Sequence, residues 1–201
     1  MIVDHVVSHF TNIFGNNNAV YDNSLIEEAI HPFIHESTNN LLTLLPSRIE
    51  TENVVFSLNK YGTPGPGGFG AFFFQTYWEI IKEDVFNAVL EFFTISIIMP
   101  DKNANTVILI PKTPNANTIN NFRPIAMTNF KFKILSKILA DMLALIMPNT
   151  VSKEQKCFIK GRHFRDCVCL TSEAINLSHN KSFGGNLALK IDIAKAFDTV
   201  D

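Results

Sequence analysis

The chain has 201 residues, and 46% of them are hydrophobic, which is enough to bury the core of one ordinary domain. Residues 1–100 hold 3 Lys and Arg against 11 Asp and Glu, whereas residues 101–201 hold 14 against 8. This composition argues against disorder, no apolar run is long enough to span a membrane, and no secretory signal is visible at the start. The basic second half suits a polyanionic partner, although a dipolar surface without a partner explains the same charges.

Apolar residues spaced by three and four predict the helices of the first half, which cover residues 2–14, 24–34, 52–58 and 70–95. Residues 39–46 are predicted to be irregular, and Thr51 is expected to cap the third helix. The Pro64–Gly68 segment predicts a loop, because proline and glycine suit neither a helix interior nor a central strand. Trp78 is expected in the core.

The second half alternates between strand and helix patterns. A hairpin of residues 106–110 and 122–127 is followed by helices over residues 130–146 and 164–177, a turn at 184–186, a strand at 187–193 and a helix at 194–200. The helix from residue 130 is expected to end before Pro148. The element order predicts a mixed α+β fold.

Three cysteines, Cys157, Cys167 and Cys169, are an odd number, and one residue between the last two is not the usual spacing of a zinc-binding pair. We expect buried free thiols.

Asp192 is the first candidate for chemistry, because it stands at the carboxyl end of an apolar strand. A carboxylate there is costly unless a cation compensates it, and Mg²⁺ prefers such oxygen ligands. An aspartate that caps the following helix explains the same position.

Two basic segments are further candidates. Lys112 and Arg123 end the two strands of the hairpin, where they could bind phosphates or simply be solvated. The segment around Gln155, Gly161 and Arg162 interleaves cations with phenylalanines, which suits a nucleic-acid strand but also fits an ordinary solvated face.

In this order, the motifs resemble those of LINE-type (non-LTR retrotransposon) reverse transcriptases, especially plant ones. The matching segments are Pro64–Phe69, Trp78–Lys82, Leu109–Lys112, Phe122–Ile125, Lys133–Ala140, Glu154–Asp166 and Ala188–Asp198. The resemblance implies the fingers and partial palm of a right-hand polymerase, truncated after the first palm strand. Residues 51–201 would form this partial domain, and residues 1–50 a helical connector without motifs.

The resemblance also implies roles for single residues. Asp192 corresponds to the first catalytic carboxylate, which binds Mg²⁺ together with the backbone carbonyl of Ile193. Phe197 corresponds to the aromatic residue under the sugar of the nucleotide. Arg123 and, with less support, Lys112 correspond to contacts with the triphosphate, and Gln155, Gly161 and Arg162 correspond to contacts with the template.

The family implies an RNA template, a DNA primer, deoxynucleoside triphosphates and a nuclear location. One departure is Gly67, which replaces the aspartate of a Pro-Asp-Gly motif. The second acidic motif of the family, an aromatic-Ala-Asp-Asp sequence, is absent from the 201 residues, so we expect no DNA synthesis by this chain alone. A non-catalytic RNA-binding remnant and a decayed element copy without a selected role remain the alternatives.

Overall fold

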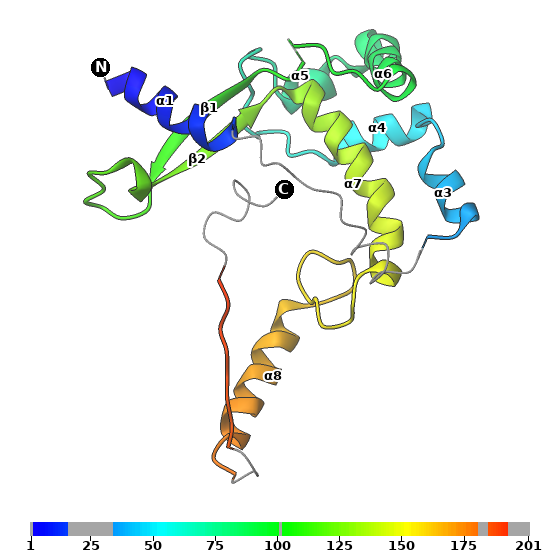
Figure 1. Ribbon diagram of the computed structural model, residues 1–201. Helices are drawn as coiled ribbons and strands as arrows, with labels where there is room; N and C mark the ends of the chain where they lie inside the picture. Colours follow the sequence, from blue (N-terminus) through cyan, green and yellow to red (C-terminus); the bar gives the residue numbers. More distant parts are fainter. Residues whose placement is uncertain (1, 16–33, 101, 181–184, 193–201) are drawn as a thin grey trace. The chain divides into compact units, whose positions relative to one another are not determined.

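The computed structural model describes residues 2–15, 34–100, 102–180 and 185–192, which fall into two compact units (Figure 1). Residues 33–161 form one unit, and residues 1–32 together with 162–201 form the other. The expected mixture of helices and strands is confirmed. None of the helices within these ranges is long and apolar enough to cross a membrane.

The unit of residues 33–161 is a helical core that carries one hairpin. Its elements are α3 (Glu36–Leu42), α4 (Arg48–Ser57), α5 (Ala71–Thr76), α6 (Trp78–Ile95), β1 (Asn105–Pro111), η1 (Ile119–Asn121), β2 (Phe122–Thr128) and α7 (Phe130–Thr150). Helix α4 contacts α5, α6 and α7, and α3 contacts α7. The buried side chains come from these helices and include Val55, Phe74, Ile134 and, as predicted, Trp78.

The start of α4 differs from the prediction. The N-cap is Ser47, not Thr51: Ser47 Oγ accepts a hydrogen bond from the Glu50 backbone N–H, and Glu50 accepts one from the Ser47 backbone N–H. This capping box satisfies two amide donors of the first turn and begins the helix four residues earlier than expected. Thr51 is instead buried, and its hydroxyl donates to the Ser47 carbonyl.

Three other helix boundaries differ as well. Residues 39–42, predicted to be irregular, belong to α3, and the single helix predicted over 70–95 breaks at Tyr77 into α5 and α6. Helix α7 continues through Pro148, which lies only two residues before its end. Bonds from the Val151 N–H to the Met147 carbonyl and from Thr150 Oγ1 to the Ile146 carbonyl support this last turn, so the proline does not terminate it.

The other unit contains α1 (Ile2–Phe14) and α8 (Phe164–Leu177), and both helices match their predictions. The cysteines are free as expected, but they are not buried: Cys157 and Cys167 are half-buried and Cys169 is exposed. Residues 185–192 pair with no other strand in the described ranges, so the predicted strand over 187–193 is not formed there. A strand pattern becomes a strand only with a hydrogen-bonding partner. The predicted helices over 24–34 and 194–200 lie almost wholly or wholly outside the described residues.

Candidate functional site

The hairpin is antiparallel, with Ile110 opposite Arg123 and Pro111 opposite Phe122. Directly opposite side chains share a face of a sheet, so Arg123 lies beside Ile110, and the next pair on that face is Ile108 with Ile125. None of the strand residues is buried, and Arg123 is exposed. The hairpin therefore presents a guanidinium next to an apolar stripe.

Lys112 follows β1 at the same end of the hairpin as Arg123. Its backbone N–H donates to the Asn121 carbonyl at 2.8 Å, and Nζ donates to the Asn120 carbonyl at 2.9 Å. These bonds close the loop that joins the strands. Since an ammonium group has three donors, Lys112 can serve this structural role and still bind a phosphate.

The glycine-rich loop is held against the junction of β2 and α7. Asn129 Oδ1 accepts a hydrogen bond from the Gly67 N–H at 2.8 Å, and Lys133 Nζ donates to the Thr63 carbonyl at 2.7 Å. A Cβ on Gly65 would stand 2.4 Å from the backbone of Thr128. We call these contacts the loop clasp. The aspartate that Gly67 replaces is thus not needed to fix the loop, because Asn129 and Lys133 do so.

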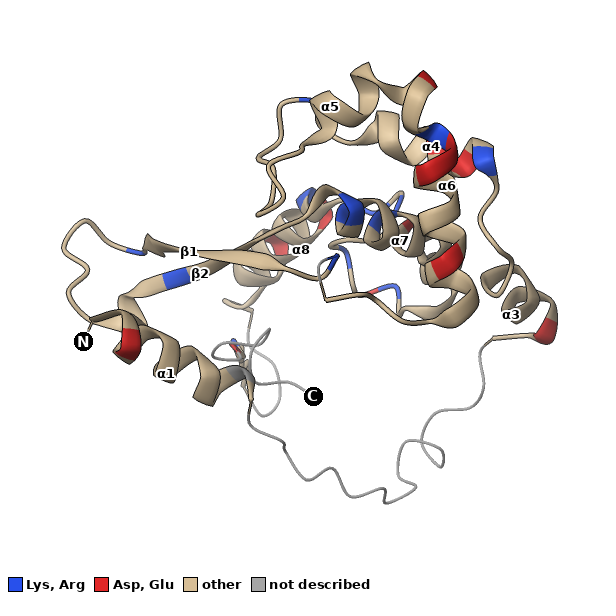
Figure 2. Ribbon diagram, turned by 90° about the horizontal axis from the view of Figure 1, so that it is seen from above, with Lys and Arg blue, Asp and Glu red and all other residues tan. Residues whose placement is uncertain are grey.

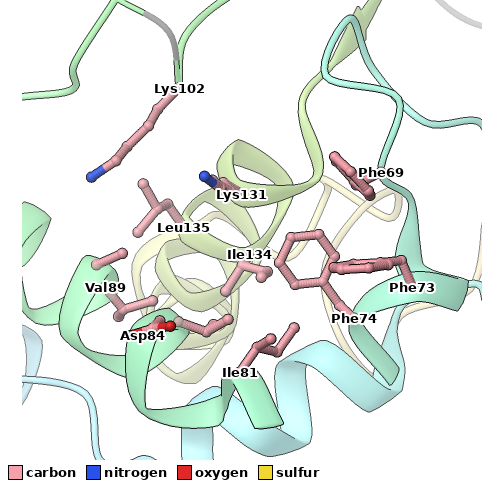
Figure 3. Close-up of a pocket in the computed structure, with 12 residues that line it drawn as sticks. Phe69, Phe73, Phe74, Ile81, Asp84, Val89, Lys102, Lys131, Ile134 and Leu135 are labelled. Atoms are coloured by element: carbon pink, nitrogen blue, oxygen red, sulfur yellow. The ribbon is translucent and has the colours of Figure 1, made fainter. Parts of the chain in front are cut away.

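The loop clasp adjoins an apolar pocket of about 300 Å³ between α6 and α7 (Figure 3). Three phenylalanines line one side of it, and Lys102, Lys131 and Asp84 bring charges to it. Lys102 also pairs with Glu91 at 2.8 Å. Sequence patterns do not reveal this pocket, because its walls combine residues from four segments that only the fold brings together.

Residues 152–161 form a loop after α7 that contains three lysines and one glutamate. Gln155 Nε2 donates to the Cys157 carbonyl at 3.2 Å, so this side chain braces the loop. Gly161 has a φ of 81° and Phe158 a φ of 63°. A left-handed backbone is unremarkable for glycine, but it is unfavourable for phenylalanine, and the sequence does not reveal it.

The remaining predicted residues lie in the other unit or outside the described ranges. Arg162 is half-buried at the start of that unit, and Asp192 is exposed in its unpaired segment. Ile193 and Phe197 lie outside the described residues. Lys112 and Arg123 thus lie at the same end of the hairpin, and Gln155 and Gly161 belong to the same loop. Arg123 and Asp192 belong to different units, so the structure defines no arrangement of the two.

Within the described ranges, no group of three or more His, Cys, Asp and Glu side chains could hold a metal ion. Asp192 offers one carboxylate on an unpaired segment. A magnesium ion bound by protein needs a near-octahedral set of oxygen ligands. The described residues alone therefore do not fit a firmly held metal ion.

In the unit of residues 33–161, helices α3, α4 and α6 carry more acidic than basic side chains and α7 carries more basic ones, although Arg48, Lys82 and Asp141 are exceptions. Acidic side chains stand on α3, α4 and α6, and lysines stand along α7 (Figure 2). Lys131, Lys133 and Lys137 lie on this helix. These three lysines contribute part of the positive net charge of residues 101–201.

Comparison with known proteins assigns this basic half. Residues 110–201, a little under half of the chain, match the sequence model of the family described as "Reverse transcriptase (RNA-dependent DNA polymerase)". This segment is similar in sequence to reverse transcriptases. The matched segment starts at Ile110 in β1, two residues before Lys112, and contains every residue to which the motifs gave a role.

A curated relative extends the reverse transcriptase match toward the N-terminus. The chain is 27% identical over 140 residues to the "Transposon TX1 uncharacterized 149 kDa protein" of Xenopus laevis. The aligned part covers 69% of this chain but only 11% of that relative. The resemblance to LINE-type reverse transcriptases predicted from the motifs is confirmed. Its narrower form, a plant-like member, stays a prediction.

Proposed function

We propose that the chain is part of an RNA-directed DNA polymerase of a LINE-type retrotransposon. The observation that carries this proposal is the family match over residues 110–201, because that segment holds all eight predicted site residues. In this proposal residues 51–201 contribute the fingers and early palm, and residues 1–50 are a connector. A nuclear location follows from the target-primed mechanism of the family.

The proposed reaction is nucleotidyl transfer from a deoxynucleoside triphosphate to a primer 3′-hydroxyl on an RNA template. Arg123 binds the triphosphate from the hairpin, with Lys112 beside it, and Gln155, Gly161 and Arg162 contact the template. Asp192 and the Ile193 carbonyl contribute metal ligands, and Phe197 packs under the sugar. In the proposed complete enzyme, divalent ions held partly by these ligands would activate the hydroxyl and neutralise the leaving pyrophosphate.

The 201 residues alone lack the second acidic motif, and one carboxylate does not hold two divalent ions. We therefore propose that this chain by itself does not synthesise DNA. Primer extension on an RNA template with Mg²⁺ tests this: no incorporation above background is the expected result. Metal-dependent incorporation that disappears in Asp192→Asn would overturn the proposed inactivity while supporting the role of Asp192.

A non-catalytic template-binding role is the second candidate, and the lysines of residues 152–161 favour it. Binding of single-stranded RNA should weaken as salt rises, since each phosphate contact adds roughly 0.7 to the slope of log K against log salt. Replacing Lys160, Arg162 and Arg165 with glutamine should reduce that slope. The matched control replaces the three Lys and Arg residues of residues 1–100, namely Arg48, Lys60 and Lys82. An equal loss in both triple variants would contradict a localised template site.

A further inference from the structure

We propose that Phe158 is a stacking platform for an unpaired base of single-stranded RNA, held outward by the loop of residues 152–161. The inference rests on the proposed function and deepens it, because it adds Phe158 to the motif residues that already have an assigned role. It is carried by the exposure of the ring, the conformation of its backbone, the anchoring of its neighbour and the charges around it.

The exposure of Phe158 is extreme for an aromatic residue. Its relative accessible surface is 102%, so the ring makes no packing contact that stabilises the described fold. Ile159, the next residue, is 5% exposed. The loop is therefore anchored through Ile159 while Phe158 is directed to solvent. Single exposed apolar residues are common, so exposure alone does not define a site.

The backbone of Phe158 makes the exposure more informative. Its φ of 63° lies in the left-handed region, which is an outlier for a bulky residue and suits glycine or asparagine. Phenylalanine thus occupies a position where glycine would be more stable and where its ring contributes nothing to packing. Such strain persists where a side chain is needed for a purpose other than folding.

The surrounding charges point to a polyanion. Lys153, Lys156 and Lys160 lie within five residues of Phe158, against one acidic residue, Glu154. Lysines that neutralise phosphates and an aromatic face that accepts a base are the two parts of a site for single-stranded nucleic acid. Because every base has a π-face, such a platform is tolerant of sequence, which a polymerase that copies a whole template requires.

The test uses the full chain and a short single-stranded RNA that carries 2-aminopurine, whose fluorescence is quenched by stacking. Binding to the wild-type chain should quench the probe. Phe158→Ala and Phe158→Leu should lower RNA affinity by about five-fold to a hundred-fold, the range that base stacking on an aromatic residue contributes, and should remove the quenching. Phe158→Trp should retain both.

Phe158→Gly separates binding from folding. Glycine accepts the left-handed backbone, so this variant should melt at a higher temperature than the wild type while binding RNA as weakly as Phe158→Ala does. A residue with a purely structural role would not combine a higher melting temperature with weaker RNA binding when it is replaced. The control is Phe56→Ala, which removes a half-exposed phenylalanine from the acidic helix α4 and should leave RNA affinity unchanged.

Three results would overturn the proposal. Equal affinity of wild type and Phe158→Leu would show that an apolar contact suffices without stacking. Unchanged RNA affinity in all Phe158 variants would show that the ring does not bind RNA and would favour a contact with a protein partner instead. The proposed polymerase function would then stand. Absence of RNA binding by the wild-type chain at low salt would remove the nucleic-acid partner itself and so count against both proposals.

Discussion

At the scale of single residues, Gly65 shows how closely the glycine-rich loop approaches the rest of the fold. A Cβ at this position would lie 2.4 Å from the backbone of Thr128, and backbone atoms cannot move aside as the end of a side chain can. Gly68 differs: its φ is 75°, and an added Cβ there would meet nothing within 4 Å. Gly65 is required because there is no room for a Cβ, and Gly68 is favoured because its backbone is left-handed.

We expect Gly65→Ala to destabilise the unit by about 1–3 kcal/mol, the usual cost of forcing extra volume into a packed site. The change should also loosen the loop clasp, because the loop must withdraw from Asn129. Urea unfolding gives the free energy, and limited proteolysis reports cleavage near residue 65. Gly68→Asn is the control, since asparagine tolerates a left-handed backbone. Equal losses in both variants would count against the close approach.

At the scale of elements, helix α7 organises the core of its unit. Ile134 is 1% exposed on this helix, whereas Leu139, five residues later, is 40% exposed. We expect Ile134→Ala to cost about 2–5 kcal/mol of unfolding free energy through lost burial and a residual cavity, and Leu139→Ala to cost far less. Chemical denaturation of both variants measures the difference. Similar costs would mean that α7 does not bury this face.

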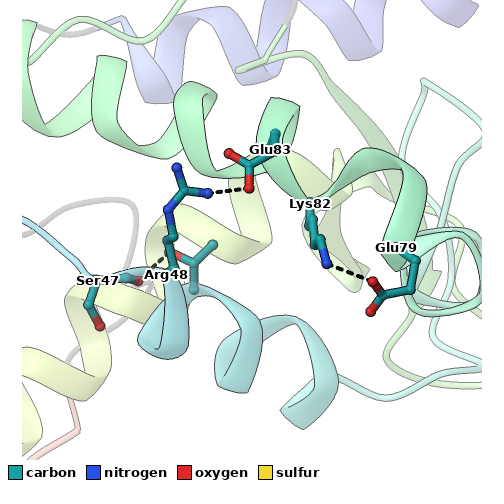
Figure 4. Close-up of polar contacts among 6 residues, drawn as sticks. Ser47, Arg48, Glu79, Lys82 and Glu83 are labelled. Atoms are coloured by element: carbon teal, nitrogen blue, oxygen red, sulfur yellow. Dashed lines mark hydrogen bonds and ion pairs between the residues drawn. The ribbon is translucent and has the colours of Figure 1, made fainter.

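Helices α4 and α6 are also joined by an ion pair between Arg48 and Glu83 (Figure 4). The hydrogen bond from Arg48 lowers the pKa of the Glu83 carboxyl below its ordinary value of 4.5. A depressed pKa contributes stability that is fully present above that value and is lost as the pH falls through the folded-state pKa. Both side chains are exposed, so the contribution is small.

We therefore expect the unfolding free energy of Glu83→Gln to depend slightly less on pH in the acid range than that of the wild type. Wild type should lose more stability than Glu83→Gln as the pH falls below 4.5, and the two should converge in about 1 M salt, where exposed charges are screened. Urea midpoints measured at several pH values give the comparison. Parallel curves for the two proteins would exclude a contribution from this pair.

At the scale of the whole molecule, residues 187–192 form no strand pairing within the described ranges, and we expect them to promote self-association. Leu187, Leu189 and Ile191 alternate along this segment, and all three are exposed. An apolar segment without a partner strand is a template for pairing with another copy. We expect Leu189→Lys to reduce concentration-dependent association in sedimentation velocity. Leu145→Lys, on the exposed side of α7, is the control and should have little effect.

The sequence predicted those parts of the fold that depend on local pattern. The hairpin and helices α1 and α8 follow from apolar period and turn residues, and Trp78 was correctly placed in the core. The cap of α4 was recoverable too, since Ser47 and Glu50 have the spacing of a capping box. The prediction that α7 ends before Pro148 is wrong, because a proline near a helix end removes little from the hydrogen-bond ladder.

The features that could not be predicted depend on contacts between distant segments. Nothing local to Gly65 indicates that Thr128 lies against it, and nothing local to Phe158 indicates a left-handed backbone. The strand pattern at 187–192 failed for the same reason, because pairing depends on another strand. The predicted site residues keep their assigned roles as predictions, with Lys112 and Gln155 now also having structural ones.

Gly65 packs against the backbone of Thr128, at the end of β2 that is farther from Arg123. Arg123 lies five residues from Thr128 along β2, roughly 17 Å at the rise of an extended strand. A change of about 10° in the direction of the strands at Thr128 would thus displace the Arg123 guanidinium by roughly 3 Å, which is more than a hydrogen bond tolerates. The position of the Arg123 guanidinium therefore depends on Gly65, a residue without a side chain that packs against the other end of β2.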